Sequence, residues 1–160
     1  MKSVIEISGK TTDEFKKLAQ TVALSVLDLM NQPEGLEVAI VFVSENEIKR
    51  LNCEQRNIDR VTDVLSFPSI SLVAGEVLDV DSEECAWLKS EKGLVHFGDM
   101  ALCIKRLREQ AKEFGVSPES ELKKLVIHSM LHLMGYDHIE DCDYEVMNEK
   151  EIYLDKNIKI

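Results

Sequence analysis

The sequence has few of the residues that interrupt or stiffen a chain, with seven glycines and three prolines among 160 residues. No segment repeats, none is of low complexity, and none has the composition of a linker. Hydrophobic residues make up 44% of the chain and charged residues 31%, as in ordinary globular proteins. These proportions exclude a fibrous or largely disordered protein. The length predicts one domain over residues 1–160, which would bury roughly 70% of the surface of the unfolded chain.

Long hydrophobic runs are also missing. The first ten residues, MKSVIEISGK, alternate polar and apolar side chains, which fits neither a signal peptide nor a membrane span. We therefore expect a cytoplasmic protein with no membrane partner. The four cysteines are widely spaced and form no CxxC pair, which argues against a disulfide framework or a cysteine-rich zinc site. We expect reduced, mostly buried thiols at Cys53, Cys85, Cys103 and Cys142.

Positive charge is scarce. Nineteen Lys and Arg face thirty Asp and Glu, and the resulting net charge of −11 repels polyanions at long range. The bases are nevertheless concentrated in two stretches, EIKRLNCEQRNIDR at 47–60 and IKRLREQAKEFG at 104–115. A solvated helix face explains each stretch as well as nucleic-acid contact does, so both interpretations stay open.

Alternation and helical periodicity predict most of the elements. The predicted strands are residues 3–8, 36–43, 62–68 and 97–104. The predicted helices are residues 11–32, 44–53, 105–115 and 117–135, followed by a terminal helix after His138. Strands and helices mix without strict alternation, which favours an α+β fold. The strand at 36–43 is apolar on both faces, so we place it centrally in the sheet.

Local signals support several of these boundaries. Thr11 with Glu14, and Ser44 with Glu47, have the spacing of capping boxes. Ser117 followed by Pro118 predicts the start of the helix that Gly135 ends. The pattern is weakest from residue 69 to 96, where Gly75–Val80 predicts a short strand and residues 82–93 a helical turn or an acidic excursion.

Three of the four histidines lie within thirteen residues, VIHSMLHLMGYDH, at 126–138. His128 and His132 are four residues apart and so project from one face of the predicted helix. Gly135 then allows the chain to reverse and bring His138 to the same point. Three neutral imidazoles suit a single Zn²⁺ ion and leave a fourth position open, which is the pattern of a catalytic site. Such a site lowers the pKa of water and polarises a scissile bond.

Other interpretations of these residues stay open. His128 and His132 could be hydrogen-bonded core histidines. Cys142 could complete a closed structural site with the three histidines, although the acidic residues around it are more typical of a solvated helix start. His96 has no partner at ligand spacing, so a surface or packing role is the better prediction.

The histidine spacing is similar to that of the zincin peptidases, whose helix carries HExxH with the glutamate as general base. Ser129 stands at the position of that glutamate. Peptide hydrolysis by that route therefore lacks its base.

Two blocks together resemble another family. LNCEQRNIDRVTDVLSFP at 51–68 and HSMLHLMGYDH at 128–138 resemble the YbeY family of bacterial single-strand-specific metallo-endoribonucleases, which act in 16S ribosomal RNA 3′-end maturation and in ribosome quality control. The resemblance implies a zincin-like α+β domain, with a small mixed sheet and a central metal-binding helix. It also implies zinc ligands at His128, His132 and His138 and a functional arginine at Arg56.

The chain departs from the family pattern at a few positions. Ser129 replaces a common glycine, Gln55 a common tyrosine and Val61 a common proline, and the connection from Pro68 to Gly98 is longer than usual. None of these changes removes an implied ligand. The long connection leaves the rim of the site undefined.

The resemblance gives Arg56 a role that its chemistry suits, because a guanidinium binds a phosphodiester bidentately and stabilises charge developing on it. A surface salt bridge is the alternative for Arg56. Asp137 either orients a histidine or caps the turn, and Asp63 is similarly open. The attacking oxygen, from water or from the ribose 2′-hydroxyl, also stays open.

The acidic chain should bind isolated single-stranded RNA weakly and with a steep salt dependence, so we expect the ribosome or a ribosome-associated protein as a partner. Two other functions are compatible with the sequence. One is a non-enzymatic, zinc-stabilised adaptor on ribosomal particles, and the other is a metallopeptidase-like hydrolase.

Overall fold

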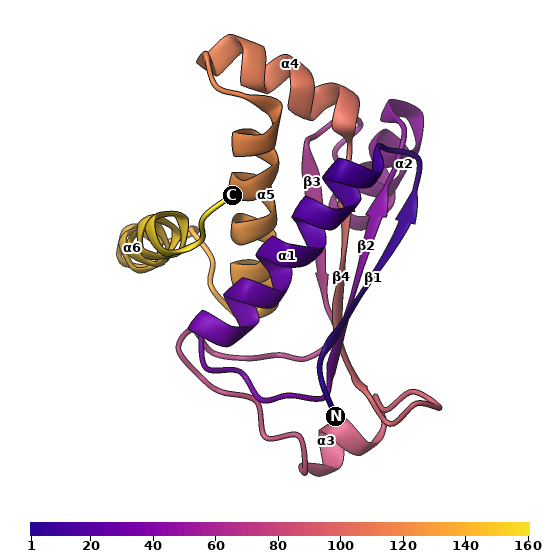
Figure 1. Ribbon diagram of the computed structural model, residues 1–160, viewed down its shortest axis with the longest axis vertical. Helices are drawn as coiled ribbons and strands as arrows, with labels where there is room; N and C mark the ends of the chain where they lie inside the picture. Colours follow the sequence, from indigo (N-terminus) through magenta and orange to yellow (C-terminus); the bar gives the residue numbers. More distant parts are fainter.

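A computed structural model describes all residues from 1 to 160, with four strands in one sheet. The strands are β1 (Val4–Gly9), β2 (Leu36–Phe42), β3 (Val64–Pro68) and β4 (Val95–Leu102), in the spatial order β1-β2-β4-β3. β1, β2 and β4 run parallel, and β3 pairs antiparallel with β4 at the edge of the sheet (Figure 1). The sheet is therefore mixed, and β2 lies inside it as predicted.

Six helices surround the sheet. They are α1 (Asp13–Leu29), α2 (Glu45–Arg56), α3 (Glu83–Ala86), α4 (Ile104–Phe114), α5 (Pro118–Leu133) and α6 (Asp141–Asn157). The helix α5 contacts α1, α4, α6 and the strands β3 and β4, so it is the central helix of an α+β fold (Figure 1). No helix is both long and apolar enough to cross a bilayer.

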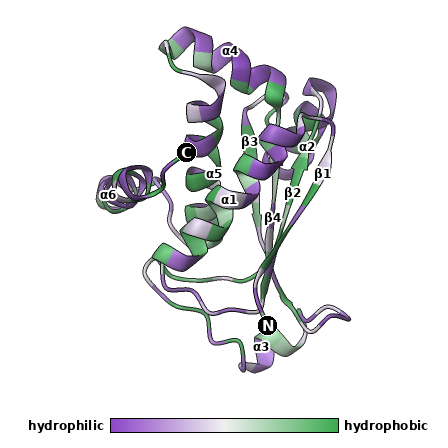
Figure 2. Cartoon of the chain, viewed as in Figure 1, coloured by the Kyte–Doolittle hydropathy of each residue, from purple (hydrophilic) through white to green (hydrophobic).

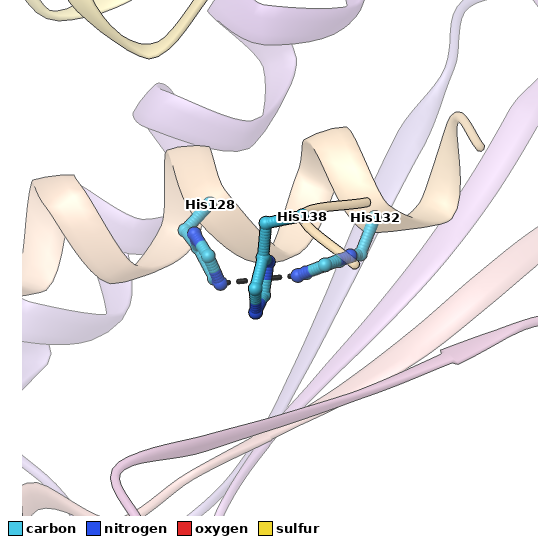
Figure 3. A group of neighbouring side chains, drawn as sticks. All are labelled: His128, His132 and His138. Carbon is cyan, nitrogen blue, oxygen red and sulfur yellow. Dashed lines mark hydrogen bonds between the residues drawn. The ribbon is translucent and has the colours of Figure 1, made fainter. Parts of the chain in front are cut away.

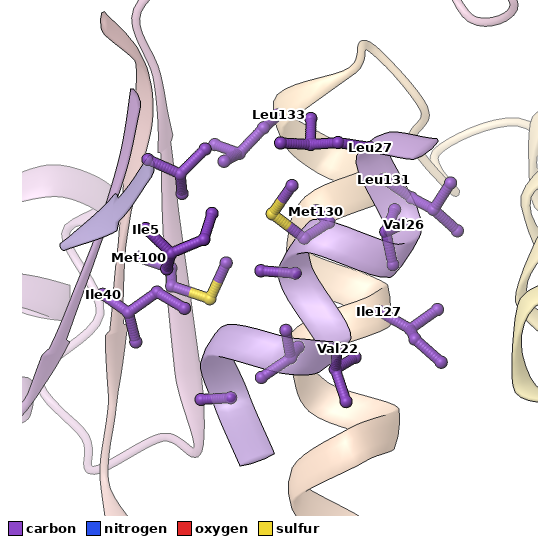
Figure 4. Packing of buried hydrophobic residues seen from close by; sticks show 14 of the residues in the cluster. Ile5, Val22, Val26, Leu27, Ile40, Met100, Ile127, Met130, Leu131 and Leu133 are labelled. Atoms are coloured by element: carbon purple, nitrogen blue, oxygen red, sulfur yellow. The ribbon is translucent and has the colours of Figure 1, made fainter. Parts of the chain in front are cut away.

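The main core lies between the sheet and the helices α1 and α5. Alternate residues of β2 are buried, and Ile40 and Met100 of the sheet lie on the side that faces Met130 of α5 (Figure 4). Figure 2 shows the same arrangement as apolar colour on the strands and inner helix faces, with α4 largely polar. A smaller cluster on the opposite face joins Ile48 of α2 to Leu65 of β3. The two clusters hold α5 and α2 at fixed positions relative to β3.

Most predicted boundaries are confirmed, with four corrections. The helix α1 is capped by Thr12, whose hydroxyl accepts from the Phe15 N–H at 3.2 Å, so the prediction of Thr11 was wrong by one residue. The helix α2 continues three residues past the predicted end at Cys53, to Arg56. Two of the cysteines, Cys53 and Cys142, are exposed, so the thiols are not mostly buried.

The fourth correction is the strand predicted at Gly75–Val80, which does not form. The Gln32 side chain takes the place of a strand partner, donating to the Glu76 carbonyl at 3.1 Å and accepting from the Leu78 N–H at 3.1 Å. The helical turn predicted after Ser82 is present as α3.

A glycine in β4 determines how closely α5 approaches the sheet. A Cβ atom on Gly98 would lie 2.7 Å from Leu133 Cδ2 and 2.9 Å from the Phe67 carbonyl oxygen. Such distances are too short for carbon atoms in a packed core. Gly98 therefore lets the histidine-bearing helix pack tightly beside β3 and β4.

Candidate metal centre

The helix α5 brings two histidines together in its last turns. His128 and His132 leave the same face of the helix and their rings point toward each other, with the Nε2 atoms 3.1 Å apart (Figure 3). The His138 ring comes from the segment after the helix and lies 5.7 Å and 5.3 Å from the other two ring centroids. One ligand atom from each of the three residues lies within 4.8 Å of the others. The structure thus places the three histidines around one point.

The turn between His132 and His138 depends on the long connection between β3 and β4. Gly135 has φ of +91°, and a Cβ there would lie 2.0 Å from the Leu72 carbonyl oxygen. Tyr136 is buried, which raises its pKa, and a hydrogen bond from the Gly75 backbone acts in the opposite direction. Residues of the connection therefore support the turn that carries the third imidazole.

The hydrogen bonds to the outer ring nitrogens define which nitrogens are free. His132 Nδ1 is 2.9 Å from the Tyr136 carbonyl oxygen, which can only accept, so Nδ1 carries the hydrogen. His128 Nδ1 lies 3.5 Å from Glu151 Oε2 of α6, which favours the same tautomer. The two Nε2 atoms then face each other with lone pairs.

Two facing lone pairs at this separation repel each other unless they share a cation. A tetrahedral Zn²⁺ ion with Zn–N bonds of 2.0–2.1 Å separates two ligand nitrogens by about 3.3 Å. The observed Nε2 separation of 3.1 Å is close to this value. The donor set of three imidazoles therefore fits a zinc ion.

The pKa of His132 favours the same state. Burial lowers this pKa most, and the neighbouring His128 lowers it further, while the hydrogen bond to Tyr136 opposes both. A lowered pKa keeps the imidazole neutral at pH values where an exposed histidine is protonated. Neutral imidazole is the form that binds metals.

The other interpretations of these residues find less support in the geometry. His128 and His132 are only half-buried and face a cleft with the exposed His138, unlike core histidines. Cys142 is exposed on α6 and is not part of the group of ligand atoms. His96 lies on β4, with Nε2 3.0 Å from Asp99 Oδ2, in a surface role as predicted.

The histidines border a cleft of about 1110 Å³. Its walls come from the end of α2, the edge strand β3, the second half of α4, the length of α5 and the turn at 135–139. Arg56, the last residue of α2, lines this cleft, is exposed and forms no ion pair, so the predicted alternative of a surface salt bridge is not observed. Asn57 ends α2 in the left-handed conformation, directly after Arg56.

The two aspartates have structural partners. Asp63 Oδ1 accepts from the Val64 N–H at 2.7 Å and its Oδ2 accepts from Gln110 Nε2 at 2.9 Å, which ties the start of β3 to α4. Asp137 Oδ1 accepts from the Ile139 N–H at 3.3 Å, so Asp137 caps the turn before His138. Both residues line the cleft.

Ser129 does not act as a general base. It is fully buried, and its hydroxyl lies 2.7 Å from the Ser66 hydroxyl of β3. A serine held in this way has no carboxylate to offer, so the glutamate-dependent chemistry of the zincin peptidases has no counterpart here.

Sequence reasoning missed two acidic residues at the site. Glu151 comes from the terminal helix and reaches His128, and Glu121 lies two turns before His128 on α5. Glu121 had a weak signal in the sequence, because it is seven residues before His128 and so shares its helix face. Glu151 had no such signal in the sequence, because it reaches His128 only through the packing of α6 against α5.

Half of the eight basic residues in the two stretches form ion pairs with acids nearby. Lys105 Nζ lies 2.8 Å from Glu45 Oε1, and Arg106 Nη1 lies 3.4 Å from Glu109 Oε2. In the first cluster Arg50 pairs with Glu54 at 3.0 Å, whereas Arg56 forms no such pair. The stretch at 104–115 is therefore a solvated helix face, and Arg56 is the residue of the first cluster that faces the cleft.

The fold and the site define a class of protein, the zincin-like α+β proteins with two histidines on a central helix and a third in the segment that follows it. The chain belongs to a particular family within this class, because the family model described as "Endoribonuclease YbeY" matches residues 4–159. That resemblance was already evident in the two sequence blocks, and it is confirmed.

Curated relatives have the same description. "Endoribonuclease YbeY" of Clostridium kluyveri is 37% identical over 154 residues, covering 94% of this chain and 93% of that protein. The protein of the same name from Clostridium acetobutylicum is 40% identical over 138 residues, covering 82% of this chain and 83% of that protein. The solution structure of TM1509 from Thermotoga maritima matches with a TM-score of 0.61 and 30% identity, over 96% of this chain and 87% of that one.

Proposed function

We propose that this chain is a single-strand-specific, zinc-dependent endoribonuclease that acts in 16S ribosomal RNA 3′-end maturation and in 70S ribosome quality control. Membership of the endoribonuclease family supports an enzyme that cuts RNA. The observation that carries the proposal is a single cleft onto which three imidazoles and the unpaired guanidinium of Arg56 open. The proposed substrate places the protein in the cytoplasm, with the ribosome or a ribosome-associated protein as its partner.

His128, His132 and His138 would hold one zinc ion. When bound, zinc would supply a Lewis acid that polarises a phosphoryl oxygen and acidifies water. Glu151 and the Tyr136 carbonyl keep hydrogens on the outer ring nitrogens of His128 and His132, which orients both rings. His138 is supported through its turn, which Gly135 and Asp137 shape.

Arg56 would bind the phosphodiester. Its guanidinium can donate two parallel hydrogen bonds to the non-bridging oxygens and stabilise negative charge that develops on them. Asp63, which lines the same cleft, ties the start of β3 to α4 and so fixes that part of the cleft wall. Arg56 is thus proposed as a catalytic residue, and Asp63 and Asp137 as positioning residues.

Metal analysis combined with single-stranded RNA cleavage tests this proposal. His132→Ala should lose both zinc and cleavage. Arg56→Ala should keep zinc and fold but lose at least about 100-fold in cleavage rate, the loss typical of a residue that stabilises transition-state charge. Arg50→Ala is the matched control, because Arg50 lies on the same helix but is paired with Glu54.

The result also separates the other functions. A zinc-stabilised adaptor would bind ribosomal particles while wild type and Arg56→Ala both leave RNA intact. Cleavage of peptides by the wild type would favour a peptidase, against the evidence of Ser129. A substrate with 2′-deoxyribose at the cut site reports the attacking oxygen, since only attack by the 2′-hydroxyl requires that group.

A further inference from the structure

The cleft continues well past the three histidines. Beyond His128 it follows α5 to Lys124 and Glu121, one and two helical turns nearer the start of the helix, and it reaches Phe114 at the end of α4. In the proposed function the reacting phosphodiester lies at the histidine end. The rest of the cleft is therefore available to a neighbouring nucleotide.

A second cleft of about 470 Å³ opens from this far end, and we call it the α4–α6 notch. The residues that line both clefts are Phe114, Glu121, Lys124 and Glu151. Uncovered apolar side chains form part of the notch, with Phe114 62% and Ile152 61% exposed. Charges of both signs border the notch, from Glu151 and Asp155 and from Lys124 and Lys156. The apolar side chains between them suit the flat face of a ring, and the lysines suit the phosphate attached to it.

Glu121 adds an unmet hydrogen-bonding demand. The residue is only 2% exposed, and its Oε2 atom has no hydrogen-bond partner within the protein. An unsatisfied buried carboxyl oxygen costs free energy, so such a group in a native protein calls for an explanation. Burial raises the pKa of Glu121, while the charge of Lys124 and a hydrogen bond with the Gln110 side chain oppose the increase. A ligand in the notch would provide the missing partner.

We propose that the α4–α6 notch binds the base of a nucleotide close to the scissile phosphate. The base stacks on Phe114, its exocyclic amino group donates to Glu121 Oε2, and Lys124 contacts the adjoining phosphate. Single-stranded RNA presents unstacked bases that proteins commonly stack on aromatic side chains. Adenine, cytosine and guanine carry an exocyclic amino group and uracil does not, so the notch disfavours uracil. This inference rests on the proposed cleavage of single-stranded RNA.

Binding is tested first, with fluorescently labelled hexanucleotides and the zinc-loaded full chain. Phe114→Ala should weaken binding about tenfold, which lies within the range for loss of one base–aromatic stack. Trp87→Ala should leave binding unchanged, since Trp87 is 89% exposed and lines neither cleft. Equal affinity of wild type and Phe114→Ala would overturn the proposal.

Base preference is tested by cleavage of oligonucleotides in which each position around the cut carries uracil or cytosine in turn. At one position the wild type should cut the cytosine form several-fold faster, as kcat/KM, and Glu121→Gln should reduce this ratio to near one because an amide can also donate to uracil. Unchanged preference in Glu121→Gln, or none in the wild type, would refute the role of Glu121. Thermal unfolding checks that the variant folds.

The outcomes separate this inference from the proposed function. If the wild type cuts RNA and the Phe114→Ala and Glu121→Gln variants bind and cut it as the wild type does, the notch proposal fails and the proposed function stands. If the wild type binds RNA through Phe114 without cutting it, the proposed function fails, and with it the position of the base next to a scissile phosphate, while base binding in the notch stands. A wild type that neither binds nor cuts RNA refutes both.

Discussion

At the scale of single residues, sequence spacing was enough to find the histidines but not the groups that support them. His128 and His132 share a helix face, and Gly135 marks the reversal toward His138, so their convergence could be predicted from spacing alone. Glu151 could not be predicted in this way, because it meets His128 only through the packing of α6 on α5.

Removing Glu151 should weaken zinc binding. Glu151→Ala leaves the outer nitrogen of His128 without its carboxylate, and loss of such a partner typically costs 10–100-fold in metal affinity. Competition with a chromophoric chelator measures this affinity without reference to activity. Glu149→Ala is the matched control, since Glu149 is exposed on the same helix and makes no ion pair. Equal affinities of the two variants would contradict the role given to Glu151.

The lowered pKa of His132 predicts how the stability of the metal-free protein depends on pH. Because the folded pKa lies below the unfolded value of 6.5, the unfolded state takes up a proton first as pH falls. Stability should therefore be full above pH 6.5 and decrease as pH falls from there through the folded pKa. Urea unfolding at several pH values in the presence of a chelator measures this decrease.

The variant His132→Gln isolates the contribution of His132 to this loss of stability, because glutamine does not titrate. Its free energy of unfolding should fall less than that of the wild type over the same pH interval. If both proteins lose the same amount, another group causes the acid sensitivity.

At the scale of elements, the strands and long helices were predictable because each buries a regular face. Every second residue of β2 is buried. The helix α5 begins at Pro118 with Ser117 as its cap, as the sequence predicts. The segment Gly75–Val80 alternates in a similar way, yet only Leu78 of that segment is buried and Gln32 satisfies its backbone. Alternation alone could not reveal that Gln32, in the segment after α1, would bind this backbone in place of a neighbouring strand.

The turn after α5 should be sensitive to a single methyl group. Gly135→Ala should destabilise the protein by more than Gly75→Ala, although both glycines have φ of +91°. The left-handed conformation costs an alanine about 1–2 kcal/mol at either position. At Gly135 the added Cβ would also overlap the Leu72 carbonyl, whereas nothing lies within 4 Å at Gly75. The overlap should add about 1–3 kcal/mol, as overpacking does.

Chemical denaturation of the two variants gives this difference directly. Zinc affinity should fall in Gly135→Ala as well, because the turn carries His138. Equal destabilisation by Gly135→Ala and Gly75→Ala would mean that the connection between β3 and β4 can move away from residue 135 at no cost in free energy. The connection would then not hold the turn in place.

At the scale of the whole molecule, the strand order and the antiparallel β3 depend on long-range pairing that no local pattern encodes. The charge distribution is also a property of the folded chain. The sequence predicted two basic clusters, but the fold pairs Lys105 with Glu45 and Arg50 with Glu54. The cations that line the cleft are Arg56 and Lys124. This revises the expectation of a steep salt dependence, since few phosphates can be neutralised.

RNA affinity should therefore be weak and change only modestly with salt. Two phosphate contacts on a single strand give a slope of about −1.4 in log K against log salt, or roughly sevenfold between 50 and 200 mM. Fluorescence anisotropy with a single-stranded oligonucleotide measures this slope.

Lys124→Ala should reduce the magnitude of the slope by about 0.7, the share of one phosphate contact. Lys105→Ala should not alter it, because Lys105 is paired with Glu45 and does not line the cleft. A wild-type slope several times steeper would mean that RNA binds a basic surface outside the cleft, whereas a shallow slope with weak affinity means that productive binding needs further contacts from a partner.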